Sequence, residues 1–452
     1  MERNNIREIE INLEGTEMEK RENWSTRFAF ILSTLGFSAG IGNLWRFPYL
    51  VGKYGGGVFL IFYLLVVFLI AIPLFSIEIT LGKATRKDPV GAYKTLAPQS
   101  YWFLNGYLNV ITMTIIIGYA SIIVGSIFAY IFKTAAGDFS GLSPEQTAVY
   151  FKSFFSNRNE VMFWTIITIG ILIFILRKGL IKGIEIANKI MMPSLFIIMV
   201  ILIIRSLTLS GASEGLAFYL KPDFAKFSWE GALAAIGQSF FAIGVAMAAG
   251  LVFGSYLPKD SKNVISNAGI VAICSTIIAF MAGLIIFPSI FTFSLDPAAG
   301  PGLTFITMPN VFNQMPAGNL FGTLFYILFF LAAATSFIGA YEAIIAWLRD
   351  QYKIPRNKGI WIVGFGAMII SIISASSTNF FNIADYIANN IFLILGAIFM
   401  AIFVGWIWKI PNFAKEAGIN SRKNIILWTI LIKYLAPVVM LITWITQLGI
   451  LK

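Results

Sequence analysis

Residues 36–48 read GFSAGIGNLWRFP, and this stretch decides how the chain folds. It lies in an apolar segment (27–49) that is long enough to cross a bilayer, since a hydrocarbon core of about 30 Å needs about 20 apolar residues in a helix. Gly36, Gly40 and Gly42 fall within it, and a glycine costs about 1 kcal/mol in a helix interior relative to alanine. The sequence therefore predicts a membrane helix that is interrupted in its middle.

The composition is that of a polytopic helical membrane protein. Of 452 residues, 58% are hydrophobic and 12% are charged, against roughly 25% charged in soluble domains. With one Cys and no His, a disulfide framework, a Cys/His metal site and His-based catalysis are excluded. We therefore do not expect an enzyme.

Eleven apolar segments are predicted, at 27–49, 57–81, 103–132, 161–176, 187–207, 231–257, 264–294, 321–348, 359–375, 383–408 and 424–449. Alternate loops are rich in Lys and Arg, whereas loops 295–320 and 376–382 contain neither. The positive-inside rule then predicts a cytoplasmic N-terminus and an extracytoplasmic C-terminus. The net charge of +11 reflects this topology and anionic lipid rather than binding to nucleic acid.

The expected organisation is an N-terminal arm (1–26), a ten-helix core (27–408), a cytoplasmic loop (409–423) and an eleventh helix with the C-terminus (424–452). Segment 6 is interrupted by GVAMAAG (244–250), and it corresponds to segment 1 in a five-plus-five division. Paired interruptions indicate the binding site of a transporter with inverted repeats, because unwound backbone at mid-membrane must be buried or line a cavity. The alternative is close helix packing of the GxxxG type.

The stretch GFSAGIGNLWRFPYLVGKYGGGVFLIFY (36–63) resembles the first-helix signature of the neurotransmitter:sodium symporter family. Residues 72–82, 183–193, 237–256 and 330–350 resemble its second, fifth, sixth and eighth helices. The resemblance implies an all-α polytopic membrane protein with the leucine-transporter fold: a five-plus-five inverted repeat with broken helices 1 and 6, plus an eleventh helix. It also implies a prokaryotic member in the plasma (inner) membrane.

The resemblance implies a sodium site, which we call the second sodium site after the family's usage. Its expected ligands are neutral oxygens from Gly36, Ala39, Ala332, Thr335 and Ser336. Read without the resemblance, the two hydroxyls are better explained by bonds back to the preceding helical turn.

The family's first sodium site matches less well. Ser38 and Asn43 are in place, but a sixth-helix hydroxyl is replaced by Ala242 and a seventh-helix Asn or Asp by Ser275. We therefore expect coupling to one Na⁺, with Ser38 and Asn43 as a residual first site.

Chloride involvement stays open. Chloride-dependent relatives use residues equivalent to Tyr63 and Gln238 together with hydroxyls near the first sodium site, and chloride-independent relatives place a carboxylate there. This chain has Ala242, Ser275 and Ala279 at those remaining positions and completes neither scheme.

A broken helix exposes N–H groups that can hold an anion and carbonyls that can hold a cation. Relatives that carry amines often have Asp where this chain has Gly40, so the resemblance favours a ligand with its own carboxylate: a hydrophobic or aromatic amino acid. Its expected contacts are Ser38, Gly40, Ile41, Gly42, Ile116, Ala120, Phe241, Gly244, Met247 and Ala340.

The third helix departs from the family. The Tyr that binds the substrate carboxylate corresponds to Ala120, and Tyr119 lies one residue earlier, a rotation of about 100°. A register error of one residue would instead place Tyr119 in the pocket. The wide apolar cavity implied by small residues also leaves open a non-amino-acid aromatic amine, and a non-transporting ligand sensor is the alternative from another class.

Alternating access needs two gates. By resemblance, Arg46 and Asp385 form the outer ion pair, and the inner gate consists of Arg21, Trp24, Tyr256 and Asp350. No obligate protein partner is evident; the expected partners are a small-molecule substrate and the lipid bilayer.

Three further residues are expected to support the cycle. Glu78 is an acid within segment 2, where such groups are costly and usually functional, and by resemblance it braces unwound N–H groups near segment 6. Gly183 and Pro193 bracket the start of segment 5. Unwinding there would let Na⁺ leave inward, and ordinary helix-entry chemistry explains the two residues equally well.

Overall fold

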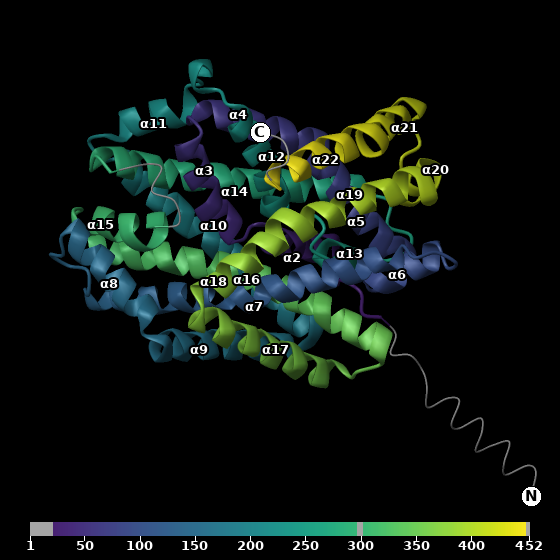
Figure 1. The fold of residues 1–452 in the computed structure, drawn as a ribbon, viewed down its shortest axis with the longest axis horizontal. Coiled ribbons are helices and arrows are strands. Elements are labelled where there is room, and N and C mark those ends of the chain that lie inside the picture. Colours follow the sequence, from purple (N-terminus) through teal and green to yellow (C-terminus); the bar gives the residue numbers. More distant parts are fainter. Residues whose placement is uncertain (1–20, 296–301, 449–452) are drawn as a thin grey trace, which may run out of the picture.

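The structure, a computed structural model, describes residues 21–295 and 302–448, which are largely helical (Figure 1). Within these ranges no β-strand forms, and an isolated bridge joins Gly56 to Pro222. Parts of the expected N-terminal arm (1–20), of loop 295–320 (296–301) and of the C-terminal segment (449–452) lie outside the described residues. The predicted all-α class is confirmed.

Nine spans in the described part of the chain are long and apolar enough to cross a membrane. They are Gly57–Thr85, Phe103–Ala136 (α7), Arg158–Leu176 (α9), Leu180–Leu207, Val264–Thr292 (α14), Gly318–Tyr352 (α16), Arg356–Ser376 (α17), Thr378–Ile407 and Arg422–Gln447. The composite spans comprise α4 (Gly57–Val66), η2 (Val67–Ala71) and α5 (Ile72–Thr85); η3 (Leu180–Glu185) and α10 (Ile186–Leu207); α18 (Thr378–Tyr386), η6 (Ile387–Phe392), α19 (Leu393–Ile402) and η7 (Phe403–Ile407); α21 (Arg422–Thr429), η8 (Ile430–Leu435) and α22 (Ala436–Gln447).

Two more segments are interrupted. The first pairs α2 (Arg27–Ser38) with Gly42–Lys53, which consists of η1 (Gly42–Arg46) and α3 (Phe47–Lys53), and the two halves are bent by 52°. The second pairs α12 (Trp229–Ile243) with α13 (Ala249–Ser255). Counting the bent pair as one, the described residues contain ten spans that are long and apolar enough to cross a membrane. The helices α12 and α13 lie at the predicted sixth segment (231–257), so the two interruptions fall in the first and the sixth predicted segments.

Short elements connect the spans. They are α6 (Pro89–Leu96), α8 (Pro144–Ser156), α11 (Ala212–Leu220), η4 (Phe224–Lys226), η5 (Leu303–Thr307), α15 (Met308–Asn313) and α20 (Ile410–Ala417). Several begin with a capping side chain: Ser143 and Gln146 form a capping box at α8, and Asp88 caps α6. Such caps satisfy N–H groups that a helix start leaves without partners.

The interrupted segments lie inside the bundle. α2 packs against α14 and α16, and α13 packs along α5 and α16. Every residue of α13 is buried, whereas α10 and α22 carry exposed apolar side chains such as Ile190 and Val438. The unwound backbone is therefore shielded from lipid, as it must be at mid-membrane.

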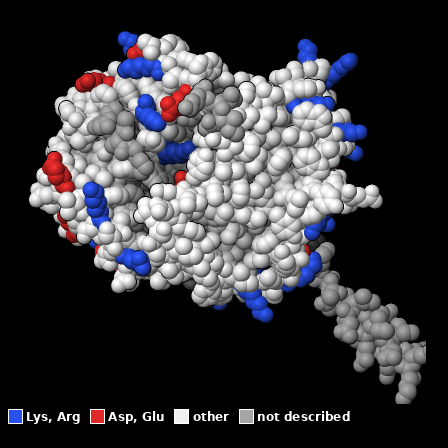
Figure 2. Space-filling model, in the orientation of Figure 1, with Lys and Arg blue, Asp and Glu red and all other residues white. Residues whose placement is uncertain are grey.

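Charged side chains on the face shown in Figure 2 gather at the two ends of the bundle and leave an uncharged band between them. Near the end that carries α6, α20 and α21 in Figure 1, the visible charges are mostly Lys and Arg, whereas the opposite end shows both signs. An apolar belt with one basic end is the arrangement that the positive-inside rule describes.

Candidate functional site

The first break places backbone carbonyls and a π-helical turn side by side. α2 ends at Ser38, the N–H of Ala39 still donates to Leu35 O at 2.7 Å, and η1 starts at Gly42. A Cβ on Gly40 would lie 2.3 Å from Ser336 Oγ, and one on Gly42 would lie 2.3 Å from the Phe241 ring. Both positions therefore need glycine because neighbouring side chains approach the backbone closely.

The second break is held in an uncommon conformation. Between α12 and α13, Gly244 has φ +79°, and two non-glycine residues, Ala246 and Ala248, have φ +60° and +64°. Residues with a Cβ pay for a left-handed conformation with strain of order 1–3 kcal/mol each. The N–H of Ala246 donates to Glu78 Oε2 at 3.3 Å, so the Glu78 carboxyl group lies against this segment.

Gly36, Ala332, Thr335 and Ser336, four of the five expected ligands of the second sodium site, meet where α2 ends against α16. Ser336 Oγ donates to the carbonyls of Phe37 (2.7 Å) and Gly36 (3.2 Å). Thr335 Oγ1 donates to Leu331 O and Ala332 O, both at 3.0 Å. A set of neutral carbonyl and hydroxyl oxygens next to a gap in a helix fits a monovalent hard cation such as Na⁺.

The residues of the first sodium site also meet, and they bond to one another. Asn43 Nδ2 donates to Ser275 Oγ (2.7 Å) and Ser275 O (3.2 Å), with a longer contact to Ser38 O (3.4 Å). Ser275 Oγ donates to Ala242 O at 3.0 Å. Within the described chain Asn43 Oδ1 has no partner. The Ser38 hydroxyl is directed elsewhere and donates to Ile243 O at 2.8 Å.

The two residues relevant to chloride are buried beside this network. Gln238 Nε2 donates to Gly42 O at 2.9 Å, and Tyr63 packs on Phe47 with ring centroids 4.8 Å apart. Tyr63 Oη and Gln238 Oε1 have no partner among the described residues. The Tyr63 hydroxyl can donate to an anion or to water, whereas Gln238 Oε1 is an acceptor and suits a donor only. Chloride involvement stays open.

The expected substrate residues surround the two breaks. Ile116, Met247 and Ala340 are buried; Gly42 and Gly244 are buried as well, whereas Gly40, Ile41, Ala120 and Phe241 are half-buried. Tyr119 faces another element: its hydroxyl accepts from Asn389 Nδ2 at 2.9 Å, and its ring meets Phe381 edge-on at 5.3 Å. Tyr119 is thus engaged with η6 and α18.

The outer ion pair is not formed. No salt bridge among the described residues joins Arg46 to Asp385. The Arg46 guanidinium lies 5.5 Å from the centre of the Phe241 ring, and Asp385 accepts from Asn389 Nδ2 at 2.8 Å. Arg46 and Asn389 line a cavity of about 220 Å³ together with residues of α3, α12 and η6 and with Gln447.

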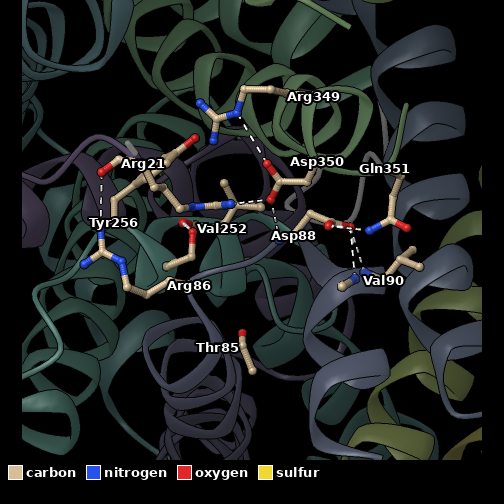
Figure 3. A network of polar contacts seen from close by, with 12 residues as sticks. Arg21, Thr85, Arg86, Asp88, Val90, Val252, Tyr256, Arg349, Asp350 and Gln351 are labelled. Atoms are coloured by element: carbon tan, nitrogen blue, oxygen red, sulfur yellow. Dashed lines mark hydrogen bonds and ion pairs between the residues drawn. The ribbon is translucent and has the colours of Figure 1, made fainter. Parts of the chain in front are cut away.

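The inner gate is formed. Arg21 pairs with Asp350 and lies 5.0 Å from the centre of the Tyr256 ring. Trp24 donates through its indole N–H to Phe253 O (2.9 Å) and through its backbone N–H to Tyr256 O (3.2 Å). Figure 3 shows Arg21 and Asp350 at the centre of this network. Gly183 lies in η3 and Pro193 inside α10, so segment 5 is helical at this point and not unwound.

The gate has members that sequence reasoning missed. Asp88 caps α6, accepts from Gln351 Nε2 at 2.7 Å, and its N–H donates to Asp350 at 2.9 Å (Figure 3). Burial and the nearby Asp350 charge raise the pKa of the Asp88 carboxyl to about 6. The sequence Asp-Pro at the start of a helix is typical of an N-terminal cap, and it could have predicted this one.

A second missed group is a buried ion pair. Glu342, fully buried, accepts two bonds from Arg356 at 2.8 and 2.7 Å and a third from Tyr256 Oη at 2.6 Å. Glu342 could have been predicted from the sequence because it is an acidic residue inside an apolar helix. The same observation identified Glu78. The pair joins α16 to α17, and the Tyr256 bond links both to the end of the broken sixth segment.

Comparisons with known proteins agree on one family of membrane transporters. The model of the Sodium:neurotransmitter symporter family matches residues 21–142 and 145–451. The uncharacterised sodium-dependent transporter YhdH of Bacillus subtilis is 32% identical over 448 residues, covering 96% of this chain and 99% of the relative. An uncharacterised sodium-dependent transporter of Methanocaldococcus jannaschii is 31% identical over 442 residues, covering 93% and 88%.

A solved structure matches along the same length. The crystal structure of MhsT in complex with L-phenylalanine has a TM-score of 0.87 to this structure, with 34% identity. The match covers 95% of this chain and 100% of that one. It extends the likeness from sequence to the arrangement of helices.

Proposed function

Since the chain belongs to the Sodium:neurotransmitter symporter family, we propose that it imports a hydrophobic or aromatic amino acid together with one Na⁺ per cycle. Family membership makes it a sodium-dependent multi-pass membrane transporter of a small molecule, and not an enzyme. The substrate class, the stoichiometry and the orientation in the membrane are the proposal.

The observation that carries the sodium assignment is the meeting of α2 and α16 at the first break. The Gly36 carbonyl and the hydroxyl of Ser336 come within 3.2 Å of each other, with the Thr335 hydroxyl on the same helix. Gly40 lets Ser336 approach the backbone, since a Cβ at this position would lie 2.3 Å from Ser336 Oγ. When Na⁺ binds, the two hydroxyl oxygens coordinate the ion through their lone pairs. The hydrogen bonds that the hydroxyls now donate are then broken or redirected.

The substrate assignment is supported by the same break. The first N–H groups of a helical segment that starts at Gly42 have no partner inside that segment and suit a carboxylate. No acidic side chain stands at position 40 to receive an isolated amine. The buried apolar groups Ile116, Met247 and Ala340 suit an apolar side chain. The phenylalanine bound by MhsT supports an aromatic amino acid in particular.

One Na⁺ per cycle is supported by the state of the first site. Ala242 offers no side-chain oxygen, and Ser275 Oγ is already bonded to Asn43 Nδ2 (2.7 Å) and to Ala242 O (3.0 Å). Among the described residues, this leaves Asn43 Oδ1 without a partner. Ser275 also has a shorter side chain than the Asn or Asp that it replaces, and it offers one oxygen where Asp offers two. The second site would then carry the coupling ion.

The two gates give the sequence of events. With the inner gate closed and the Arg46–Asp385 pair apart, Na⁺ and substrate enter from the side of the 220 Å³ cavity. Phe241, half-buried below Arg46, closes over the ligand. The inner pair then separates, which is inexpensive once water reaches both charges. We place the inner gate and the N-terminus on the cytoplasmic side, and each Na⁺ then contributes about 2.3 kcal/mol per 100 mV.

Ala120 favours a second candidate within the same mechanism. It provides no hydroxyl for a substrate carboxylate, and Tyr119 is bonded to Asn389. An aromatic amine without a carboxylate is therefore the alternative cargo.

Ligand-induced thermal stabilisation of the purified protein tests both candidates. Hydrophobic and aromatic amino acids are compared with the matching amines, each in Na⁺ and in K⁺. We expect the unfolding temperature to rise only with an amino acid in Na⁺, since a ligand that binds the folded state stabilises it by mass action. Stabilisation by amines alone would select the alternative cargo, and equal stabilisation in K⁺ would contradict sodium coupling.

A further inference from the structure

Asn188 is a buried amide on α10 that lies against the first break. Its side chain is almost fully enclosed, with a relative exposure of 1%. Its Nδ2 donates to Ile184 O at 2.9 Å, which fixes the orientation of the amide because the oxygen would be repelled by that carbonyl. Asn188 Oδ1 therefore points away from its own helix, and within residues 21–295 and 302–448 it has no hydrogen-bond partner.

The unpaired oxygen lies beside two residues that are expected to supply sodium ligands. A Cβ placed on Gly36 would lie 2.2 Å from Asn188 Oδ1 and 3.2 Å from Thr335 Cβ. Asn188 Oδ1, Gly36 and Thr335 thus converge on one point between α2, α10 and α16, and these helices pack against one another. Buried acceptors in proteins nearly always have a partner, so an unpaired acceptor beside Gly36 and Thr335 needs a donor or a cation.

We propose that Asn188 Oδ1 is an additional ligand of the cation at the second sodium site; this inference rests on the sodium-coupled function proposed above. An amide oxygen is a neutral hard ligand of the same kind as the carbonyls around it. It adds no net charge, and so it suits a monovalent ion that must also be released.

The position of Asn188 places this ligand on the inner-gate side of the ion. Glu185 lies one helical turn earlier, at the end of η3, and its carboxylate accepts from the Ser25 N–H (2.8 Å) and the Ser25 hydroxyl (2.5 Å). Ser25 follows Trp24 of the inner gate directly. Departure of the N-terminal arm therefore removes the contact that holds the first turn of α10, and movement of this turn withdraws the Asn188 oxygen from the ion.

The test is the Na⁺ dependence of thermal stabilisation in purified full-length variants. Asn188→Leu keeps the approximate volume and removes the oxygen, and we expect the half-maximal Na⁺ concentration to rise about tenfold, equivalent to about 1.4 kcal/mol. Asn188→Asp adds a charge beside the cation, and we expect that concentration to fall several-fold. Ser194→Ala is the matched control, since Ser194 also bonds back to its own helix (Ile190 O, 2.8 Å) but is directed outward.

The outcomes separate a ligand from a purely structural amide. A structural role would lower the unfolding temperature of Asn188→Leu equally at all Na⁺ concentrations and leave the half-maximal concentration unchanged, which overturns the inference. If Asn188→Leu does not fold, Asn188→Asp decides, because an unchanged or raised half-maximal concentration contradicts a ligand role. Absence of any Na⁺ effect in the wild-type protein would instead refute the sodium-coupled function itself.

Discussion

At the scale of single residues, Gly40 shows how close the two walls of the second sodium site come. The Cβ of any other residue at this position would lie 2.3 Å from Ser336 Oγ, closer than non-bonded atoms approach. Ser336 is held by its own bond to Phe37 O at 2.7 Å. A side chain at position 40 must therefore displace Ser336 or push α2 away from α16.

We expect Gly40→Ala to raise the half-maximal Na⁺ concentration for stabilisation by about tenfold or more, because a lost contact of about 1.4 kcal/mol corresponds to that factor. Gly366→Ala is the matched control: Gly366 lies inside α17, and its Cβ would meet nothing within 4 Å. The control should gain up to about 1 kcal/mol of helix stability with an unchanged Na⁺ dependence. An unchanged Na⁺ dependence in Gly40→Ala would show that Ser336 is not a ligand of the second sodium site.

Contacts between distant residues could be predicted only where the residues belong to a recognisable motif. Asn43 and Ser275 were paired through resemblance, and the structure brings them to 2.7 Å. Asn188 and Gly36 gave no such signal. Asn188 reads as an ordinary polar residue in a helix, and its role depends on α2 and α10 packing together, which no short-range pattern encodes.

At the scale of elements, the two breaks differ in how far the sequence predicts them. The glycines of residues 36–42 indicate the first break directly, since each weakens the helix. In the second break, Gly244 gave the position, but the positive φ angles of Ala246 and Ala248 were not predictable, because alanine favours a helix. The surrounding structure, including the bond from Ala246 N–H to Glu78, holds them there.

The start of α6 is an element whose stability depends on pH. The Asp88 carboxyl caps this helix, and burial together with the Asp350 charge raises its pKa from 3.8 to about 6. Between these values the folded chain holds a proton that the unfolded chain has released. Lowering the pH from 6 to 3.8 therefore favours the folded state at this position, and above pH 6 the full cost of the buried charge is present.

We expect Asp88→Asn to raise the unfolding temperature relative to wild type at pH 7.5, since Asn also caps helices well. The difference should shrink as the pH falls through 6 and vanish near 3.8, as measured by thermal unfolding at a series of pH values. Lys87→Gln is the control for loss of a neighbouring charge. A difference between Asp88→Asn and wild type that stays constant over this range would show that Asp88 does not titrate there.

At the scale of the whole molecule, the structure has one gate formed and the other apart. Arg21 and Asp350 are paired, whereas Arg46 and Asp385 are not joined in the described part of the chain. The sequence identified both pairs but could not say which one is closed, because each contributes little when hydrated and more when enclosed. Conformational state depends on this balance over many contacts and not on any single motif.

The orientation in the membrane is testable with two single cysteines in a Cys274→Ser background. Lys415→Cys lies on α20 and Glu145→Cys on α8, and both side chains are exposed. By the positive-inside rule we expect a membrane-impermeant thiol reagent added outside intact cells to label position 145 and not position 415. Inside-out vesicles should reverse the result. Labelling of position 415 from outside would invert the proposed topology.

The central claim is that an inward Na⁺ gradient drives accumulation of an aromatic or hydrophobic amino acid. Its most direct test is uptake of radiolabelled phenylalanine or tryptophan by proteoliposomes under an imposed Na⁺ gradient, with the Na⁺ dependence fitted for the number of ions. We predict accumulation above equilibrium that collapses when the gradient is dissipated, with a dependence on one Na⁺. Uptake that is equal in K⁺, or that never exceeds equilibrium for any tested amino acid, would contradict the account.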